Sequence, residues 1–229
     1  MKAVQLENDF WRVTLLPESN GKIVEMTYKP TGRDVVRPTR GLDRFRWEEW
    51  VRQGEGPTAQ SILAYNVEAQ PAKALLTLTT ADGTLIERTI TLAGEAIRFE
   101  TAMTANAPRQ FDVNVHPEYD TATTSDDWKV LSVYVKAPKW VNASRGWKHA
   151  IPNEAQDAAI VNAVAGGAFA YYNHKAKFGV EQTFNPDEFS ALSLFLSPSR
   201  QQANLELLSK IVSLEKGQQA RFAYEVRYL

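Results

Sequence analysis

The stretch ALLTLTTADGTLIERTITLAGEAIRFETAM, residues 74–103, repeatedly alternates apolar and polar side chains. A period of two is typical of a β-strand with one apolar face. Turn residues divide the stretch at Asp82-Gly83 and again at Ala93-Gly94-Glu95. Asp-Gly favours the type I′ turn of a tight β-hairpin, because both residues tolerate a positive φ. The stretch therefore predicts antiparallel strands over residues 74–80, 84–92 and 97–103.

The same alternation recurs on both sides of this hairpin, in short segments rich in Val, Ile, Thr, Phe and Tyr. Residues 203–214 suit a strand or a helix, and residues 39–58 and 140–162 look like long loops. The pattern predicts an all-β protein: a large antiparallel β-sandwich with few short helical turns, formed by one domain over residues 1–229. A closed barrel is the alternative. The further predicted strands cover residues 10–16, 22–28, 111–120, 129–136, 167–172, 178–184, 190–196 and 220–228.

Composition excludes several classes of function. The 26 Lys and Arg residues are balanced by 27 Asp and Glu, so we expect no general attraction to nucleic acid or to an anionic membrane. No apolar run approaches the roughly 20 residues that span a bilayer, and the start MKAVQLENDF does not resemble an export signal, so we expect a cytoplasmic protein. The chain has no cysteine, and its three histidines lack metal-ligand spacing. We expect neither a metal nor another cofactor.

The stretch FDVNVHPEYD, residues 111–120, predicts a strand whose polar face carries an imidazole. His116 is on this face, and Glu118 continues the same row of polar side chains. An imidazole titrates near neutral pH, so His116 can act as a proton donor if a base lies across a cleft. The alternative is a hydrogen-bonded or solvated histidine without a catalytic role.

The stretch KFGVEQTFNPDEF, residues 177–189, places Glu181 on one face of a second strand. Gly179 lies on the same face and leaves the backbone bare, which allows a ligand to approach the acid closely. The alternative is a solvated glutamate on an edge strand.

These two stretches resemble the galactose mutarotase-like superfamily, which includes the aldose 1-epimerases. Glu181 and the following Pro186-Asp187 match the spacing around the family's general-base glutamate, and His116 with Tyr119 matches its general-acid histidine. The sequence departs from the family at Val115 and Pro117, and the family's second histidine has no counterpart that we can identify. The first and last strands, within residues 6–36 and 204–229, are also similar to those of the family.

The resemblance implies a mutarotase-like sandwich that binds a small-molecule carbohydrate. Glu181 would then remove a proton from the anomeric hydroxyl while His116 donates one to the ring oxygen. Arg44, Trp47 and Glu118 are the expected substrate-binding residues, and Arg46 and Trp50 belong to the same segment as the first two. Three functions remain open: an aldose 1-epimerase, a non-catalytic carbohydrate-binding module, and a structural or partner-binding sandwich. The sequence does not predict the sugar or the oligomeric state.

Overall fold

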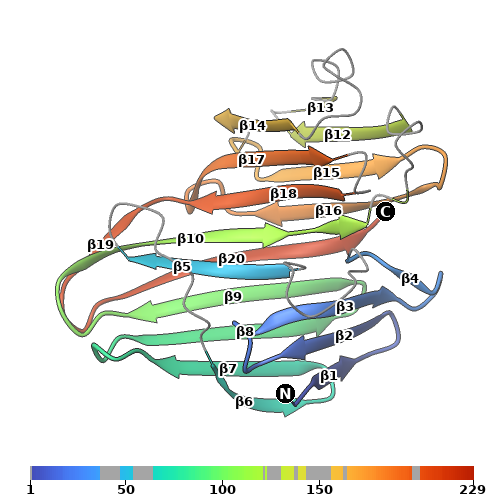
Figure 1. Ribbon diagram of the computed structural model, residues 1–229. Coiled ribbons are helices and arrows are strands. Elements are labelled where there is room, and N and C mark those ends of the chain that lie inside the picture. Colours follow the sequence, from blue (N-terminus) through green and yellow to red (C-terminus); the bar gives the residue numbers. More distant parts are fainter. Residues whose placement is uncertain are drawn as a thin grey trace.

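The computed structural model describes residues 2–36, 47–53, 64–120, 122, 130–136, 139–142, 156–161, 164–197 and 202–229. These residues form two β-sheets in which the paired strands are antiparallel, and the described part contains no α-helix (Figure 1). The large sheet has eleven strands, ordered β1-β2-β3-β5-β10-β18-β17-β14, with β4, β11 and β19 paired beside this path. The small sheet has nine strands, ordered β13-β12-β15-β16-β20-β9-β8-β7-β6.

The strands of the large sheet are β1 (Val4–Glu7), β2 (Trp11–Leu16), β3 (Lys22–Tyr28), β4 (Arg33–Asp34), β5 (Trp47–Gln53), β10 (Arg109–Pro117), β11 (Tyr119–Asp120), β14 (Gln156–Val161), β17 (Phe189–Ser197), β18 (Gln202–Ser209) and β19 (Val212–Leu214). Those of the small sheet are β6 (Asn66–Gln70), β7 (Lys73–Thr79), β8 (Leu85–Ala93), β9 (Ala96–Thr104), β12 (Leu131–Lys136), β13 (Trp140–Asn142), β15 (Ala168–Asn173), β16 (Phe178–Phe184) and β20 (Gln219–Tyr228).

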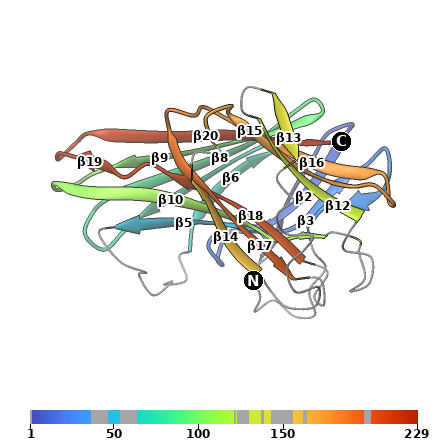
Figure 2. The ribbon, with the colours of Figure 1, turned by 90° about the horizontal axis from the view of Figure 1, so that it is seen from above.

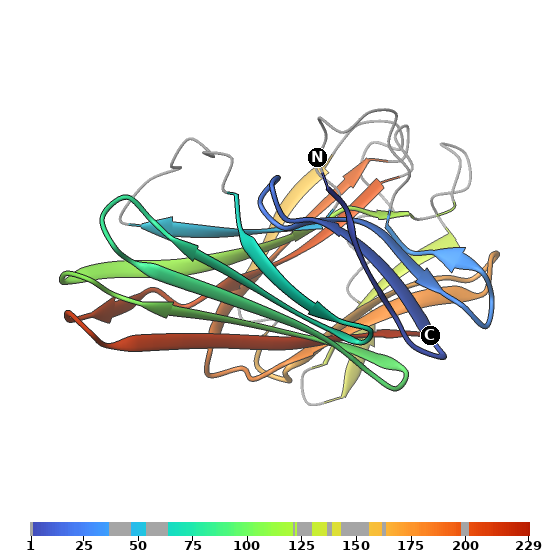
Figure 3. The same ribbon diagram turned by 90° about the horizontal axis from the view of Figure 1, so that it is seen from below.

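The two sheets pack face to face, as Figures 2 and 3 show from above and from below. Side chains from both sheets share one hydrophobic core, to which the large sheet contributes Val113 and Val115 and the small sheet Phe99 and Val226. Strands β8 and β20 alternate buried and more exposed positions, as a strand with one covered face must. The predicted all-β sandwich is confirmed. We call the face of each sheet that is turned away from the other sheet its outer face.

The predicted hairpin of residues 74–92 forms, but its turn differs from the prediction. Only Gly83 has a positive φ there, of 85°, and the Gly83 amide donates to the Thr80 carbonyl at 2.8 Å. The type I′ geometry occurs instead between β2 and β3, where Asn20 and Gly21 have φ values of 58° and 60°. The Lys22 amide closes that turn by donating to the Ser19 carbonyl at 2.9 Å.

The predicted long loop over residues 39–58 was wrong in its middle part. Residues 47–53 form β5, which lies between β3 and β10 near the centre of the large sheet. Strands β13 and β14 likewise fall inside the second expected loop. The ambiguous segment of residues 203–214 forms two strands, β18 and β19, and no helix.

Candidate functional site

Strand β10 has the two faces that its sequence predicts. Phe111, Val113 and Val115 belong to the core, so the residues between them point to the outer face of the large sheet. His116 is nevertheless only 6% exposed, because side chains from the neighbouring strands cover it. These covering side chains come from β5 on one side and from β18 on the other.

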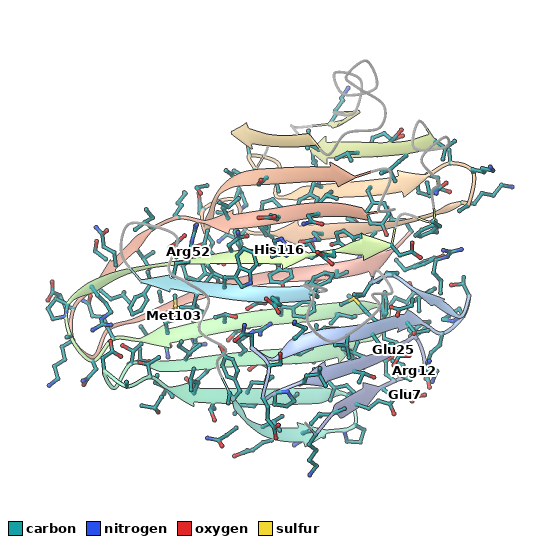
Figure 4. The ribbon with its side chains drawn as sticks, in the orientation of Figure 1. Glu7, Arg12, Glu25, Arg52, Met103 and His116 are labelled. Carbon is teal, nitrogen blue, oxygen red and sulfur yellow. The ribbon has the colours of Figure 1, made fainter. Side chains whose placement is uncertain are left out.

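Strand β5 pairs with β10 so that Glu48 lies opposite His116, and Trp50 opposite Asn114. The Trp50 and His116 rings stack with centroids 4.4 Å apart and an interplanar angle of 20°. Trp50 Nε1 donates a hydrogen bond to Glu48 Oε2 at 2.8 Å. Arg52 forms an ion pair with Asp112 farther along the two strands, and Figure 4 labels Arg52 and His116 over this part of the sheet.

Strand β18 supplies the carboxylate that His116 contacts. His116 Nε2 lies 3.2 Å from Glu206 Oε1, and the Asn204 amide nitrogen lies 3.1 Å from the same ring nitrogen. Asn114 Nδ2 donates to the other carboxylate oxygen of Glu206 at 3.0 Å. Two side chains of β10 thus hold Glu206 on the outer face of the large sheet.

Burial and hydrogen bonding act on the pKa of Glu206 in opposite directions. Burial raises this pKa, because the charged carboxylate loses its solvation. The hydrogen bond and the charge of His116 lower it, as do hydrogen bonds from Asn114 and Asn204, and together they hold the pKa of Glu206 below its usual range. Glu206 is therefore ionised at neutral pH, and it lies beside the His116 ring.

A buried ion pair connects the residues around His116 to β3. Lys22 Nζ lies 2.9 Å from Glu48 Oε1, and the side chains of the two residues are 8% and 2% exposed. Glu48 therefore links Lys22 to Trp50, and Trp50 packs on the His116 ring. We call Lys22, Glu48, Trp50, His116, Asn204 and Glu206 the outer-face cluster.

The structure does not bring the predicted pair of His116 and Glu181 together. Glu181 lies in β16 of the small sheet, and the residues on either side of it point into the core: Val180 is a core residue, and Gln182 donates a hydrogen bond to the Tyr119 hydroxyl. Glu181 therefore points out from the small sheet, whereas His116 points out from the large sheet. These faces are opposite sides of the sandwich, so the expectation that the two groups flank one sugar was wrong.

Gly179 does not leave an opening beside Glu181. A Cβ atom at this position would lie 2.2 Å from the Tyr171 carbonyl oxygen and 2.9 Å from Cδ2 of the Tyr172 ring. Residues of β15 fill the space beside Gly179, so the glycine allows β15 and β16 to pack closely.

The expected substrate-binding residues have different positions. Trp47 has no exposed surface and packs in the core against Phe99, Tyr119 and Tyr224, so its expected contact with a sugar was wrong. Glu118 is 5% exposed and comes directly after β10. By alternation its side chain points to the outer face, like that of His116 two positions earlier. Arg44 lies outside the described residues.

Glu206 and Asn204 were not predicted as site residues. The sequence NLELL, residues 204–208, carries polar side chains two positions apart, which fits a strand with one polar face. The leucines of the same segment also suit a helix, and the pairing of β18 with β10 cannot be read from either segment alone.

Within the part of the chain that the structure describes, no group of three or more His, Asp or Glu side chains could hold a metal ion. No helix that could cross a membrane is found among the same residues.

No protein-family model and no curated protein sequence matches this chain. Solved structures do match it in fold. A galactose mutarotase-like protein from Lactobacillus casei has a TM-score of 0.77 at 10% identity and covers 100% of both chains. A putative aldose 1-epimerase from Escherichia coli has a TM-score of 0.77 at 8% identity and covers 100% of this chain and 99% of its own. A GalM/aldose epimerase homologue from C. elegans has a TM-score of 0.71 at 11% identity and covers 100% and 98%.

These likenesses extend over the whole length of the chain, whereas the sequence identities are very low. They show that the chain has the fold of the galactose mutarotase-like proteins, which confirms the resemblance seen in the sequence at the level of fold.

Proposed function

We propose that this protein binds a small carbohydrate over the outer-face cluster and interconverts its anomers, as an aldose 1-epimerase does. The observation that carries the proposal is the contact of 3.2 Å between His116 Nε2 and Glu206 Oε1, at the centre of a polar sheet face. The fold likeness to proteins described as aldose 1-epimerases supports the same reaction class.

The outer face offers the groups that a sugar requires. Trp50 is partly exposed and provides apolar ring surface for the C–H groups of a pyranose. Arg52 is also partly exposed and provides guanidinium donors for hydroxyl groups, and Glu118 lies on the same side of the sheet. Apolar ring surface beside a few charged and amide groups is the usual composition of a small-molecule site.

The His116–Glu206 pair provides an acid and a base for the anomeric centre. The ionised Glu206 accepts the proton of the anomeric hydroxyl, and protonated His116 donates its Nε2 proton to the ring oxygen. The bond between the anomeric carbon and the ring oxygen breaks, and the hydroxyl oxygen forms the carbonyl double bond. The hydroxyl oxygen and the ring oxygen are both bonded to the anomeric carbon, so two neighbouring side chains on one sheet face can reach both. Rotation of the carbonyl, followed by the reverse transfers, yields the other anomer.

Optical rotation of freshly dissolved α-glucose and α-galactose tests this reaction. The wild-type protein should accelerate mutarotation, and Glu206→Gln should lower kcat by about 10²-fold or more, the usual contribution of one proton-transfer group. Glu181→Gln is the matched control, because it changes a carboxylate on the opposite side of the sandwich, and it should leave the rate within about twofold. A wild-type rate equal to buffer for several sugars would remove the enzymatic claim.

A non-catalytic carbohydrate-binding protein is the second candidate function. This candidate is favoured by contacts that the site already makes within itself. His116 Nε2 contacts Glu206 and the Asn204 amide, and Glu206 also accepts a hydrogen bond from Asn204, so these groups are engaged before a sugar binds. A sugar should then raise the melting temperature without turnover, with a stabilisation of about 2.7 kcal/mol at a concentration 100 times Kd. His116→Asn should reduce this increase.

A further inference from the structure

A buried ion pair connects the two sheets directly beneath the outer-face cluster. Arg88 of β8 lies in the small sheet and Glu49 of β5 in the large sheet. Arg88 Nε lies 2.9 Å from Glu49 Oε2, and both side chains are only 1% exposed. Strand β5 therefore carries adjacent glutamates that point in opposite directions, Glu49 into the core and Glu48 to the outer face.

Glu49 is held by several partners inside the core. The Tyr224 hydroxyl donates to Glu49 Oε1 at 2.7 Å, and the Thr101 hydroxyl donates to Oε2. Removing two charges from water is costly, and well-packed apolar replacements of such pairs are often equally stable or more stable. Stability alone is therefore a weak explanation for an ion pair at this position.

Arg88 makes a second contact, with the turn between β2 and β3. Its Nη1 donates to the Asn20 carbonyl at 3.0 Å. A Cβ atom on Gly21, the next residue, would lie 3.0 Å from the same nitrogen, so the turn packs tightly on the guanidinium group. Arg88 thus holds two separate segments of the large sheet with one planar side chain.

These two segments carry the residues that support His116. Lys22 follows the turn that Arg88 holds, and Glu48 precedes the glutamate that Arg88 binds. Lys22 and Glu48 pair at 2.9 Å, Glu48 accepts from Trp50, and Trp50 stacks on the His116 ring. A change in the relative position of the two segments would therefore be passed on to the imidazole.

We propose that Arg88 is a positioning residue for the outer-face cluster: from inside the core it fixes the β2–β3 turn against β5, so that Glu48 and Trp50 hold the His116 ring in place. The effect on a sugar reaction rests on the proposed function. The effect on the position of the His116 ring is independent of the proposed function, and a separate experiment measures it.

The double variant Glu49→Leu, Arg88→Met replaces the ion pair by apolar side chains. The variant removes two buried charges, which favours stability, but the Thr101 and Tyr224 hydroxyls lose Glu49 as their acceptor. It should therefore fold with a melting temperature near that of the wild type. Because the ring current of Trp50 acts on the stacked imidazole, loss of this stacking should move the His116 ring-proton resonances in the NMR spectrum, and kcat should fall at least tenfold. The resonances are assigned as those that disappear in His116→Asn.

Two single variants complete the experiment. Arg12→Met breaks the Arg12–Glu25 ion pair on the outer face of the same sheet, and Figure 4 labels both residues there. This control should leave the His116 resonances in place. Arg88→Lys keeps a positive charge beside Glu49 but loses the planar fork that also reaches Asn20, so it should move them.

The two measurements separate the possible failures. A folded double variant, or a folded Arg88→Lys if the double variant does not fold, with His116 resonances as in the wild type would overturn the positioning role. Shifted resonances together with a wild-type protein that is inactive on every sugar would leave the positioning role standing and overturn only the proposed reaction.

Discussion

Trp47 and Trp50 lie three positions apart on β5 and therefore on opposite faces of the strand. Replacing Trp47 by alanine should mainly reduce stability, whereas replacing Trp50 should mainly reduce sugar affinity. Trp47 has no exposed surface, and its ring packs against Phe99 and Tyr119 with centroid distances of 5.5 Å in both cases. Its Nε1 donates to the Tyr224 hydroxyl at 3.2 Å. Trp50 is partly exposed on the outer face, where it stacks on His116.

The expected loss of unfolding free energy follows from these surroundings. Replacing a fully buried Trp by Ala costs about 3–5 kcal/mol, and losing the hydrogen bond to Tyr224 adds about 1 kcal/mol. Trp47→Ala should therefore cost about 4–6 kcal/mol. Trp50→Ala removes less buried surface together with one hydrogen bond to Glu48, and it should cost about 1–2 kcal/mol.

Urea unfolding of the two variants measures this difference. At about 2–4 °C per kcal/mol for a chain of this length, the melting temperature should fall by roughly 8–24 °C for Trp47→Ala and by roughly 2–8 °C for Trp50→Ala. Sugar affinity should show the opposite order, with a loss of about tenfold for Trp50→Ala alone, which corresponds to about 1.4 kcal/mol of aromatic contact. Equal stability losses in the two variants, or a loss below about 1.5 kcal/mol for Trp47→Ala, would refute the reasoning.

Three further predictions concern single side chains. Gly179→Ala should destabilise the protein by about 1–3 kcal/mol in urea unfolding, because the new Cβ meets the backbone of β15, and a cost near zero would contradict this packing. The pKa of Asp82 is lowered from 3.8 to about 2, chiefly by a hydrogen bond from Thr80. The ionised Asp82 carboxylate therefore stabilises the folded protein above about pH 4, and this contribution disappears as the pH falls towards 2. Asp82→Asn should be less stable than the wild type in urea unfolding at pH 7 but not at pH 2. In His116→Asn the pKa of Glu206 should rise, because burial is then less opposed, and a ¹³C NMR titration of the carboxylate that shows no rise would exclude this coupling.

The sandwich could be predicted from the sequence because its hairpins carry strong local signals. Alternation and turn residues mark most of the small sheet, including the hairpins of residues 74–103. Strand β5 could not be predicted in this way, because Glu48 and Glu49 are both charged although they point to opposite faces. The charge of Glu49 is compatible with the core only through Arg88, which lies 39 positions farther along the chain. No local pattern reveals such a partner.

The candidate site was predicted in part. Alternation correctly placed His116 on a polar strand face, and the same argument placed Glu181 on one face of its own strand. Which sheet each strand joins is decided by pairing over long distances, and this pairing puts the two residues on opposite sides of the sandwich. The carboxylate that contacts His116 is Glu206, in a segment whose leucines concealed its strand period.

The most direct test of the account is a sugar titration of protein labelled with ¹⁵N in its tryptophan indoles. We predict that an aldose which the protein binds will shift the Trp50 indole resonance and the His116 ring protons until saturation. The Trp47 indole, which is enclosed in the core, should remain in place. Saturable binding that leaves Trp50 and His116 unchanged would contradict the claim that the outer face of the large sheet is the functional site.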